Sequence, residues 1–143
     1  MSAEAVAIAR GWLGTPYVHQ ASMQGVGCDC LGLLRGVWRG LLGDEPEVVP
    51  AYTPDWSEPQ GDEHLMAAAM RHMTRAGAEW QPGQVLLFRM RRGAVAKHLG
   101  ILSAAGAASA FIHAYTGHGV VESPLSQPWR RRVVARFDFP LKG

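Results

Sequence analysis

The stretch that most constrains the fold of this chain covers residues 25–34, GVGCDCLGLL. Its glycines indicate a turn into Asp29, whose carboxylate can accept the unpaired N–H groups of a first helical turn. Apolar residues then recur at spacings near three and four, which predicts a buried helix from Cys30 to near Gly43. A thiol in that first turn faces the positive end of the helix dipole. We therefore expect the thiolate form to be favoured and Cys30 to be a nucleophile.

Two further helices are expected on either side of an irregular segment. The first covers residues 2–13, and the second covers about 62–76 with Asp62 as its cap. The second helix has an apolar stripe that we expect to face the core: Leu65, Met66, Ala69, Met70 and Met73. Residues 44–61 contain four prolines and two large aromatic residues, so we expect no regular structure there.

After residue 82 the apolar pattern becomes typical of strands. Short apolar segments occur at 85–88, 98–102, 110–115, 120–122 and 132–137, with glycine-containing turns between several of them. Helices first and hairpin-linked strands last predict an α+β fold, with an antiparallel sheet packed against the Cys30 helix. The length of 143 residues and the 48% hydrophobic content suit one domain over residues 1–143.

Charge and apolar runs exclude several functional classes. The net charge of +2 is too small to call for nucleic acid, and no aromatic-interleaved basic motif is visible. No apolar run is long enough to insert in a membrane. The first residues do not resemble a secretory signal, so we expect synthesis in the cytoplasm with both thiols reduced.

Two of the six histidines lie in apolar strand segments, unlike the others. A cysteine nucleophile needs a nearby base, and that base needs a partner for its other ring nitrogen. A hairpin over residues 98–115 would bring His98 and His113 together. We therefore expect His98 to act as base toward Cys30 and His113 to orient it.

Two alternatives remain open on the residues alone. Both histidines could be satisfied core or edge residues, and Cys30 a small buried hydrophobe. A metal could instead be held by Cys28, Cys30, His98 and His113. The C-x-C spacing is shorter than a usual structural zinc pair and no second close pair exists, so we expect no metal and no cofactor.

Five short motifs resemble, in order, those of the NlpC-type papain-like cell-wall peptidases. They are GTPY at 14–17, DCLGL at 29–33, PGQV at 82–85, HLGI at 98–101 and FIHA at 111–114. The compact form is most similar to the branch found at the tail tips of phages and gene transfer agents. The resemblance implies a papain-like α+β core with the nucleophile at the start of the central helix. It also implies hydrolysis of peptide bonds in the stem peptides of peptidoglycan, often between γ-D-glutamyl and a diamino acid.

The resemblance assigns roles position by position. Cys30 corresponds to the nucleophile, His98 to the general base and then acid, and His113 to the residue that orients the base. Tyr17 corresponds to a cleft tyrosine that helps at the oxyanion, where the Cys30 amide is a further donor. Asp29 corresponds to an acid that meets a free substrate amine, in addition to its role as a helix cap.

Three positions depart from the family pattern or add to it. Leu31 stands where a serine is common, which removes a possible substrate hydrogen bond, and Gln84 stands where an acidic residue is usual. Both differences concern substrate preference rather than the triad. Cys28 is an additional thiol, for which packing is the simplest role.

A wall hydrolase without its own signal needs delivery, so we expect a tail hub or baseplate protein as partner and a phage-like tail as the place of action. Candidate docking surfaces are the segment 46–59 and a basic C-terminal strand with Trp129, Arg130, Arg131 and Arg132. The arginines could equally be a solvated strand edge. The alternative function is a catalytically silent structural or wall-binding tail subunit on the same scaffold. Acyl transfer by the same thiol chemistry is a third possibility.

Overall fold

The computed structural model describes residues 2–48 and 63–140. Within these residues, three helices and two short strands come mostly first, and a run of strands with one further helix follows. The helices are α1 (Ser2–Arg10), α2 (Cys30–Leu42), α3 (His64–His72) and α4 (Gln127–Arg132). The strands are β1 (Ser22–Met23), β2 (Gly27–Cys28), β3 (Thr74–Arg75), β4 (Val85–Arg89), β5 (Ala96–Ala104), β6 (Ala110–Tyr115), β7 (Gly119–Pro124) and β8 (Val133–Asp138). The proposed cap Asp62 and most of the docking segment 46–59 lie outside the described residues.

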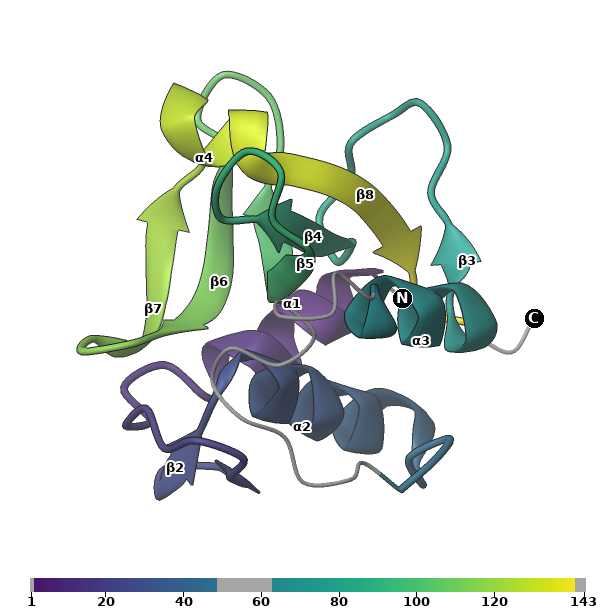
Figure 1. The fold of residues 1–143 in the computed structure, drawn as a ribbon. Coiled ribbons are helices and arrows are strands. Elements are labelled where there is room, and N and C mark those ends of the chain that lie inside the picture. Colours follow the sequence, from purple (N-terminus) through teal and green to yellow (C-terminus); the bar gives the residue numbers. More distant parts are fainter. Residues whose placement is uncertain (1, 49–62, 141–143) are drawn as a thin grey trace.

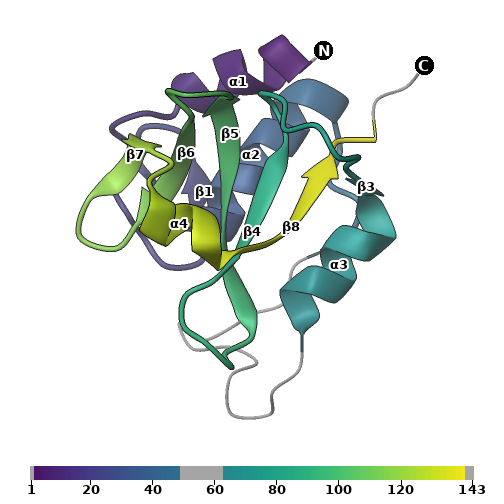
Figure 2. The same ribbon diagram turned by 90° about the horizontal axis from the view of Figure 1, so that it is seen from above.

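A six-stranded sheet in the order β3-β8-β4-β5-β6-β7 forms the centre of the molecule. All its neighbouring strands are antiparallel. Helices α1, α2 and α3 lie together on one side of this sheet and α4 lies on the other (Figures 1 and 2). The α+β fold with an antiparallel sheet packed against the Cys30 helix is thus confirmed.

The alternation of side chains along β5 and β6 separates two apolar cores. Leu99, Ile101 and Ile112 belong to the larger core, together with residues of α1, α2 and α3. Leu102 and Phe111 belong to a smaller core on the other face, which Trp129 of α4 helps to cover. Because successive strand residues point to opposite faces, His98 and His113 share the face of the smaller core.

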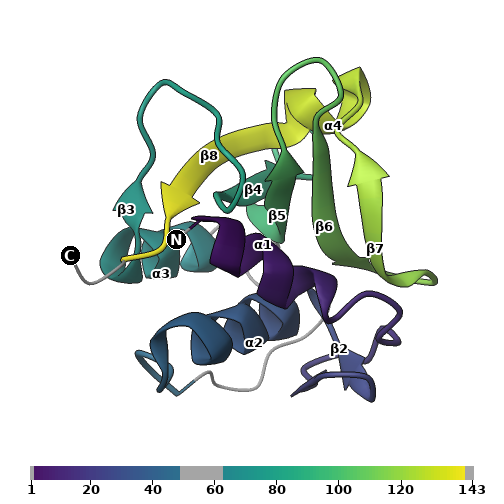
Figure 3. The same ribbon diagram turned by 180° about the vertical axis from the view of Figure 1, so that it is seen from behind.

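Close packing between α1 and α2 fixes the position of the central helix. The two helices lie side by side when the molecule is seen from behind (Figure 3). Trp12, just after α1, packs so tightly on Gly36 of α2 that an added Cβ would overlap its ring. Gly32, one turn earlier, lies against the Ala21 carbonyl in the same way. These glycines let neighbouring segments approach the helix backbone.

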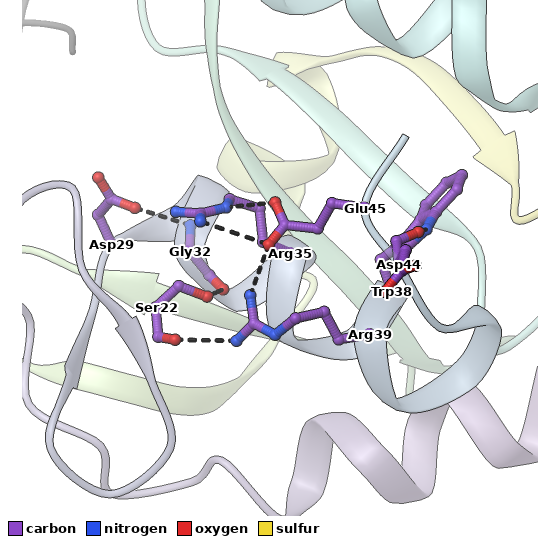
Figure 4. Close-up of polar contacts among 8 residues, drawn as sticks. All are labelled: Ser22, Asp29, Gly32, Arg35, Trp38, Arg39, Asp44 and Glu45. Atoms are coloured by element: carbon purple, nitrogen blue, oxygen red, sulfur yellow. Dashed lines mark hydrogen bonds and ion pairs between the residues drawn. The ribbon is translucent and has the colours of Figure 1, made fainter. Parts of the chain in front are cut away.

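Polar contacts hold α2 along its length (Figure 4). Ser22 Oγ donates to the Gly32 carbonyl at 2.7 Å, and Arg39 donates to the Ser22 carbonyl at 2.8 Å. Glu45 receives Arg35 at 2.7 Å and Arg39 at 2.9 Å, which ties the loop after the helix back onto it. The helix that carries Cys30 is therefore fixed to the segments before and after it.

Two helix expectations were too long. The first helix ends at Arg10 rather than residue 13, and a turn leads to Gly14, whose φ of 87° is unfavourable for other residues. The later helix ends at His72 because Thr74–Arg75 pairs with β8. Met70 was expected in the core, but 56% of it is exposed.

The expected basic C-terminal strand was wrong in its first part. Trp129, Arg130, Arg131 and Arg132 lie in α4, and the strand starts only at Val133. Arg130 lies over the Trp80 ring at 4.2 Å, and Arg136 of β8 lies over the same ring at 4.5 Å. Both arginines therefore make a cation–π contact with Trp80, in addition to any role as a charge at the edge of the sheet. No helix among the described residues has the length and apolar character needed to cross a bilayer.

Candidate active site

Asp29 sets the start of α2, as the sequence predicts. Its Oδ1 accepts the Gly32 N–H at 2.7 Å, and its Oδ2 accepts the Gln20 N–H at 2.8 Å. Asp29 is only 3% exposed, so one buried carboxylate joins the preceding loop to the first helical turn. This places Cys30 at the first position of the helix. A contact between Asp29 and a substrate amine stays a prediction.

The Cys30 sulfur lies against the backbone on both sides of His98. Its thiol donates to the Lys97 carbonyl at 3.7 Å, and the Leu99 amide hydrogen-bonds to the sulfur. This stretch of β5 remains paired with β4 through Leu87–Leu99 and Phe88–His98. Its ladder with β6, in contrast, begins only at Ile101–Ile112. The first turn of α2 therefore meets β5 just beyond the last of its paired residues with β6.

The protonation state of Cys30 differs from the sequence expectation. Amides of the first helical turn, those of Cys30 and Leu31, do lower the thiol pKa as the helix dipole argument requires. Burial has the larger effect, and the Asp29 carboxylate adds to it, so the pKa rises to about 12. The resting protein thus carries a protonated Cys30 thiol rather than a thiolate.

The hairpin formed by β5 and β6 brings the two strand histidines into direct contact. His98 Nε2 lies 2.9 Å from His113 Nδ1, as the predicted hairpin requires. His98 is 8% exposed and His113 is 1% exposed. Burial lowers the pKa of His98 to about 3, with His113 as a second cause. Burial, followed by His118, lowers that of His113 to about 4. Both rings are therefore neutral at pH 7.

Aromatic side chains surround the histidine pair. They are Phe88, Phe111, Tyr115 and Trp129. The Phe111 ring stacks on His113 with centroids 4.1 Å apart, and Trp129 lies 5.7 Å from His98 and 5.1 Å from His113. These rings displace water from the imidazoles, which is the physical cause of the lowered pKa values.

Sequence reasoning missed two residues of this site. Trp129 was placed on a strand, although Ser126 and Pro128 form a typical helix start just before it. Ser123 has its Oγ 3.1 Å from His113 Nε2. The predicted strand 120–122 stops one residue short of Ser123. Continuing the two-residue alternation from Val121, which pairs with His113, would have placed it on the same face.

Tyr17 lies close enough to Cys30 for the thiol to affect its pKa, and its role at the oxyanion stays a prediction. It forms a parallel bridge with Cys28, whose backbone also bonds to Pro16 and Val18. Burial raises the pKa of Tyr17, and the nearby Cys30 raises it further. Cys28 is fully buried and packs in the larger core. Its place is consistent with packing and with holding the strand that carries Tyr17.

Gln84 and Leu31 have structural contacts in this protein. The Gln84 side chain accepts Arg136 at 2.8 Å and donates to the Glu79 carbonyl at 3.1 Å. An ionised carboxylate at this position has no hydrogen to donate, so it could not bond to the Glu79 carbonyl. Leu31 packs against the larger core.

The metal alternative finds no support in the geometry. Within residues 2–48 and 63–140, no three histidine, cysteine or acidic side chains converge in a way that could hold an ion. Cys28, Cys30, His98 and His113 therefore do not form a ligand set. The arrangement offers instead a thiol beside a strand whose histidine is linked to a second histidine.

Comparisons with known proteins bear on the family and the fold of this chain. The NlpC/P60 family model matches residues 14–137. Among solved structures, an NlpC/P60 protein from Bacillus cereus ATCC 10987 is 18% identical with a TM-score of 0.65; the match covers 97% of this chain and 40% of that one. NlpC1 from Trichomonas vaginalis is 20% identical with a TM-score of 0.61, covering 99% and 45%.

A third structure, Ly7917 with the hydrolyzing product of MDP, is 16% identical with a TM-score of 0.63, covering 98% of this chain and 63% of that one. This chain therefore spans less than two thirds of each of these structures. A search of curated proteins finds no match. These structures share the papain-like fold. Because the family model covers most of the sequence, this chain belongs to the NlpC/P60 family.

Proposed function

We propose that this protein is a cysteine peptidase that hydrolyses peptide bonds in peptidoglycan stem peptides, with the γ-D-glutamyl–diamino acid bond as the expected target. The observation that supports this most is the position of the Cys30 sulfur, which contacts backbone atoms of both neighbours of His98. The family is generally one of cysteine peptidases, and the similar Ly7917 was solved with the hydrolyzing product of MDP. Both points favour a wall fragment as substrate.

The proposed reaction begins with both groups neutral. Since His98 Nε2 is engaged by His113, Nδ1 is the nitrogen left for the sulfur. The Cys30 thiol turns from the Lys97 carbonyl toward His98 Nδ1, transfers its proton, and the sulfur attacks the substrate carbonyl carbon. Low imidazole and high thiol pKa values oppose this transfer at rest. Substrate binding has to promote it by placing positive or hydrogen-bonding groups near the developing charges.

The attack forms a tetrahedral intermediate with a negatively charged oxygen. The Cys30 amide and the Tyr17 hydroxyl stabilise the oxyanion. His98 donates its proton to the leaving nitrogen, the C–N bond breaks, and a thioester with Cys30 remains. Water, deprotonated by His98, attacks the thioester, and the proton returns to the sulfur.

The test compares two thiol variants on purified peptidoglycan. Cys30→Ala should lower the release of new amino groups by at least about 1,000-fold, because the nucleophile is lost, without changing the folded structure. Cys28→Ala is the matched control and should retain activity. Mass spectrometry of the released fragments identifies the bond. Wild-type turnover by Cys30→Ala would contradict the proposal, and no turnover by the wild type would favour the silent-scaffold alternative.

The finer part of the proposal is the place of action, a phage-like or gene-transfer-agent-like tail tip that carries the enzyme through the envelope. It is supported by the sequence resemblance to that branch. A tail hub or baseplate protein would be the partner. Labelling with an antibody against this chain in electron micrographs of particles should mark the tail end, and label confined to the cells would contradict this assignment.

A further inference from the structure

The contact between the two imidazoles continues into a third polar side chain. His113 pairs with Val121 across the β6–β7 ladder, and Ser123 lies two residues further along β7 on the same face. His113 Nδ1 is 2.9 Å from His98 Nε2, and His113 Nε2 is 3.1 Å from Ser123 Oγ. We propose that Ser123 is a positioning residue that holds the His113 ring so that His98 presents Nδ1 to the sulfur. The inference rests on the proposed function.

The two contacts leave only two proton arrangements for neutral rings, because each neutral imidazole carries one N–H. In the first, His98 Nε2–H donates to His113 Nδ1 and His113 Nε2–H donates to Ser123 Oγ. His98 Nδ1 then has a free lone pair and can accept the thiol proton. In the second, the Ser123 hydroxyl donates to His113 Nε2, His113 Nδ1–H donates to His98 Nε2, and His98 Nδ1–H cannot act as a base.

A hydroxyl at the end of this chain of contacts has a particular electrostatic consequence. When His98 becomes an imidazolium, its Nε2–H donates to His113 Nδ1, and the His113 Nε2–H donates to Ser123 Oγ. Both acceptor atoms carry partial negative charge, so these hydrogen bonds stabilise the new positive charge. Ser123 itself stays neutral, so it orients the rings without raising their pKa as a carboxylate would. The pair therefore keeps its low affinity for protons in the resting protein.

Several ionisable groups lie near the histidine pair on the neighbouring elements. His118, in the turn between β6 and β7, lowers the pKa of His113, and its ring stacks on Tyr115. Arg132 of α4 lies 5.7 Å from the Trp129 ring that covers the imidazoles. From the helix side, Cys30 contacts β5 at Lys97, and the Asp29 carboxylate acts on the Cys30 thiol. A carboxylate introduced at position 123 would add a negative charge beside His113, in place of a neutral hydroxyl at 3.1 Å.

The test uses three substitutions at position 123 and one control. Ser123→Ala should lower kcat roughly 2- to 10-fold, the worth of one net hydrogen bond, with KM unchanged. Ser123→Thr keeps the hydroxyl and should restore kcat. Ser123→Asp should move the acidic limb of the kcat/KM profile upward by about one pH unit or more, because a negative charge stabilises the imidazolium. Ser126→Ala, at an exposed serine without a side-chain cap bond, should change neither quantity.

A spectroscopic measurement separates this inference from the proposed function. In the Cys30→Ala background, ¹⁵N NMR should show His98 protonated at Nε2 and His113 protonated at Nε2. The additional Ser123→Ala change should mix the tautomers of His113. Identical tautomers with and without Ser123, or an acidic limb unmoved by Ser123→Asp, would overturn the inference. If the protein hydrolyses no wall peptide, the tautomer result still decides the role of Ser123.

Discussion

The Cys30 sulfur is subject to two opposing electrostatic effects. Amides of the first turn of α2 and the Leu99 amide favour the thiolate, whereas burial and the neighbouring Asp29 carboxylate favour the thiol. Burial wins because removal of water affects the whole charge of the sulfur, while each amide supplies only part of a charge. The carboxylate that caps the helix is thus also a reason why the Cys30 thiol rests protonated.

Alkylation by iodoacetamide measures this balance directly. In a Cys28→Ser background, Cys30 should react far more slowly at pH 7 than a free thiol, whose pKa is about 8.5. Its rate should rise about tenfold per pH unit through pH 9, because its pKa of about 12 lies above this range. The Cys28→Ser/Cys30→Ala double variant lacks both thiols and reports the background reaction. A rate that is already maximal below pH 7 would show that the resting sulfur is a thiolate.

At the scale of elements, α4 shields the imidazoles of His98 and His113 from water. The helix has six residues, and its Trp129 ring contacts both imidazoles as well as Phe88 and Phe111. Arg130 of α4 lies over the Trp80 ring. Trp80 packs against the smaller core, but within the described residues its ring pairs with neither histidine. The two tryptophans therefore allow shielding of the imidazoles to be distinguished from anchoring of α4.

We expect Trp129→Ala to admit water to the imidazoles and to raise the pKa values of His98 and His113 from about 3 and about 4 toward 6.5. NMR titration of both rings measures the change. Trp80→Ala is the control; it removes the ring between Arg130 and Arg136 and should leave both pKa values near those of the unaltered protein. Equal shifts in the two variants would mean that general loosening of α4, rather than shielding by Trp129, sets the protonation of the pair.

The elements show what the sequence could and could not predict. The start of α2 was predictable because the Asp29 cap and the apolar spacing are local signals, and the histidine contact followed from one hairpin. The true end of α3 depends on Thr74–Arg75 pairing with the distant β8, which no local pattern reveals. The thiol pKa was mispredicted for a related reason, since burial is decided by strands far from Cys30 in sequence.

At the scale of the whole molecule, the two faces of the sheet differ in what they carry. One face is covered by α1, α2 and α3, and α4 lies on the other (Figure 1). The alternation along β5 and β6 places both histidines on the α4 face. Cys30 belongs to the helical side and reaches β5 at Lys97, beyond the residues that pair β5 with β6. The proposed catalytic groups therefore meet only if helix, sheet and α4 are all in place, which couples the site to global folding.

This coupling predicts how the free energy of unfolding depends on pH. The unfolded chain binds protons at both histidines below about pH 6.5, but the folded protein does so only near pH 4 and pH 3. Between these limits the unfolded state holds more protons, so stability is full above pH 6.5 and falls as the pH is lowered. The extra slope approaches about 1.4 kcal/mol per pH unit for each buried imidazole.

Urea unfolding between pH 7.5 and pH 4 measures this slope, and His113→Asn isolates one contribution to it. The variant should unfold more easily at every pH, because His98 Nε2 loses its imidazole partner, yet its loss of stability on acidification should be shallower by up to about 1.4 kcal/mol per pH unit. The slope is the informative quantity, since a constant destabilisation does not affect it. Parallel curves for the two proteins would mean that His113 titrates alike in the folded and unfolded chains, and that the aromatic surroundings do not keep it neutral.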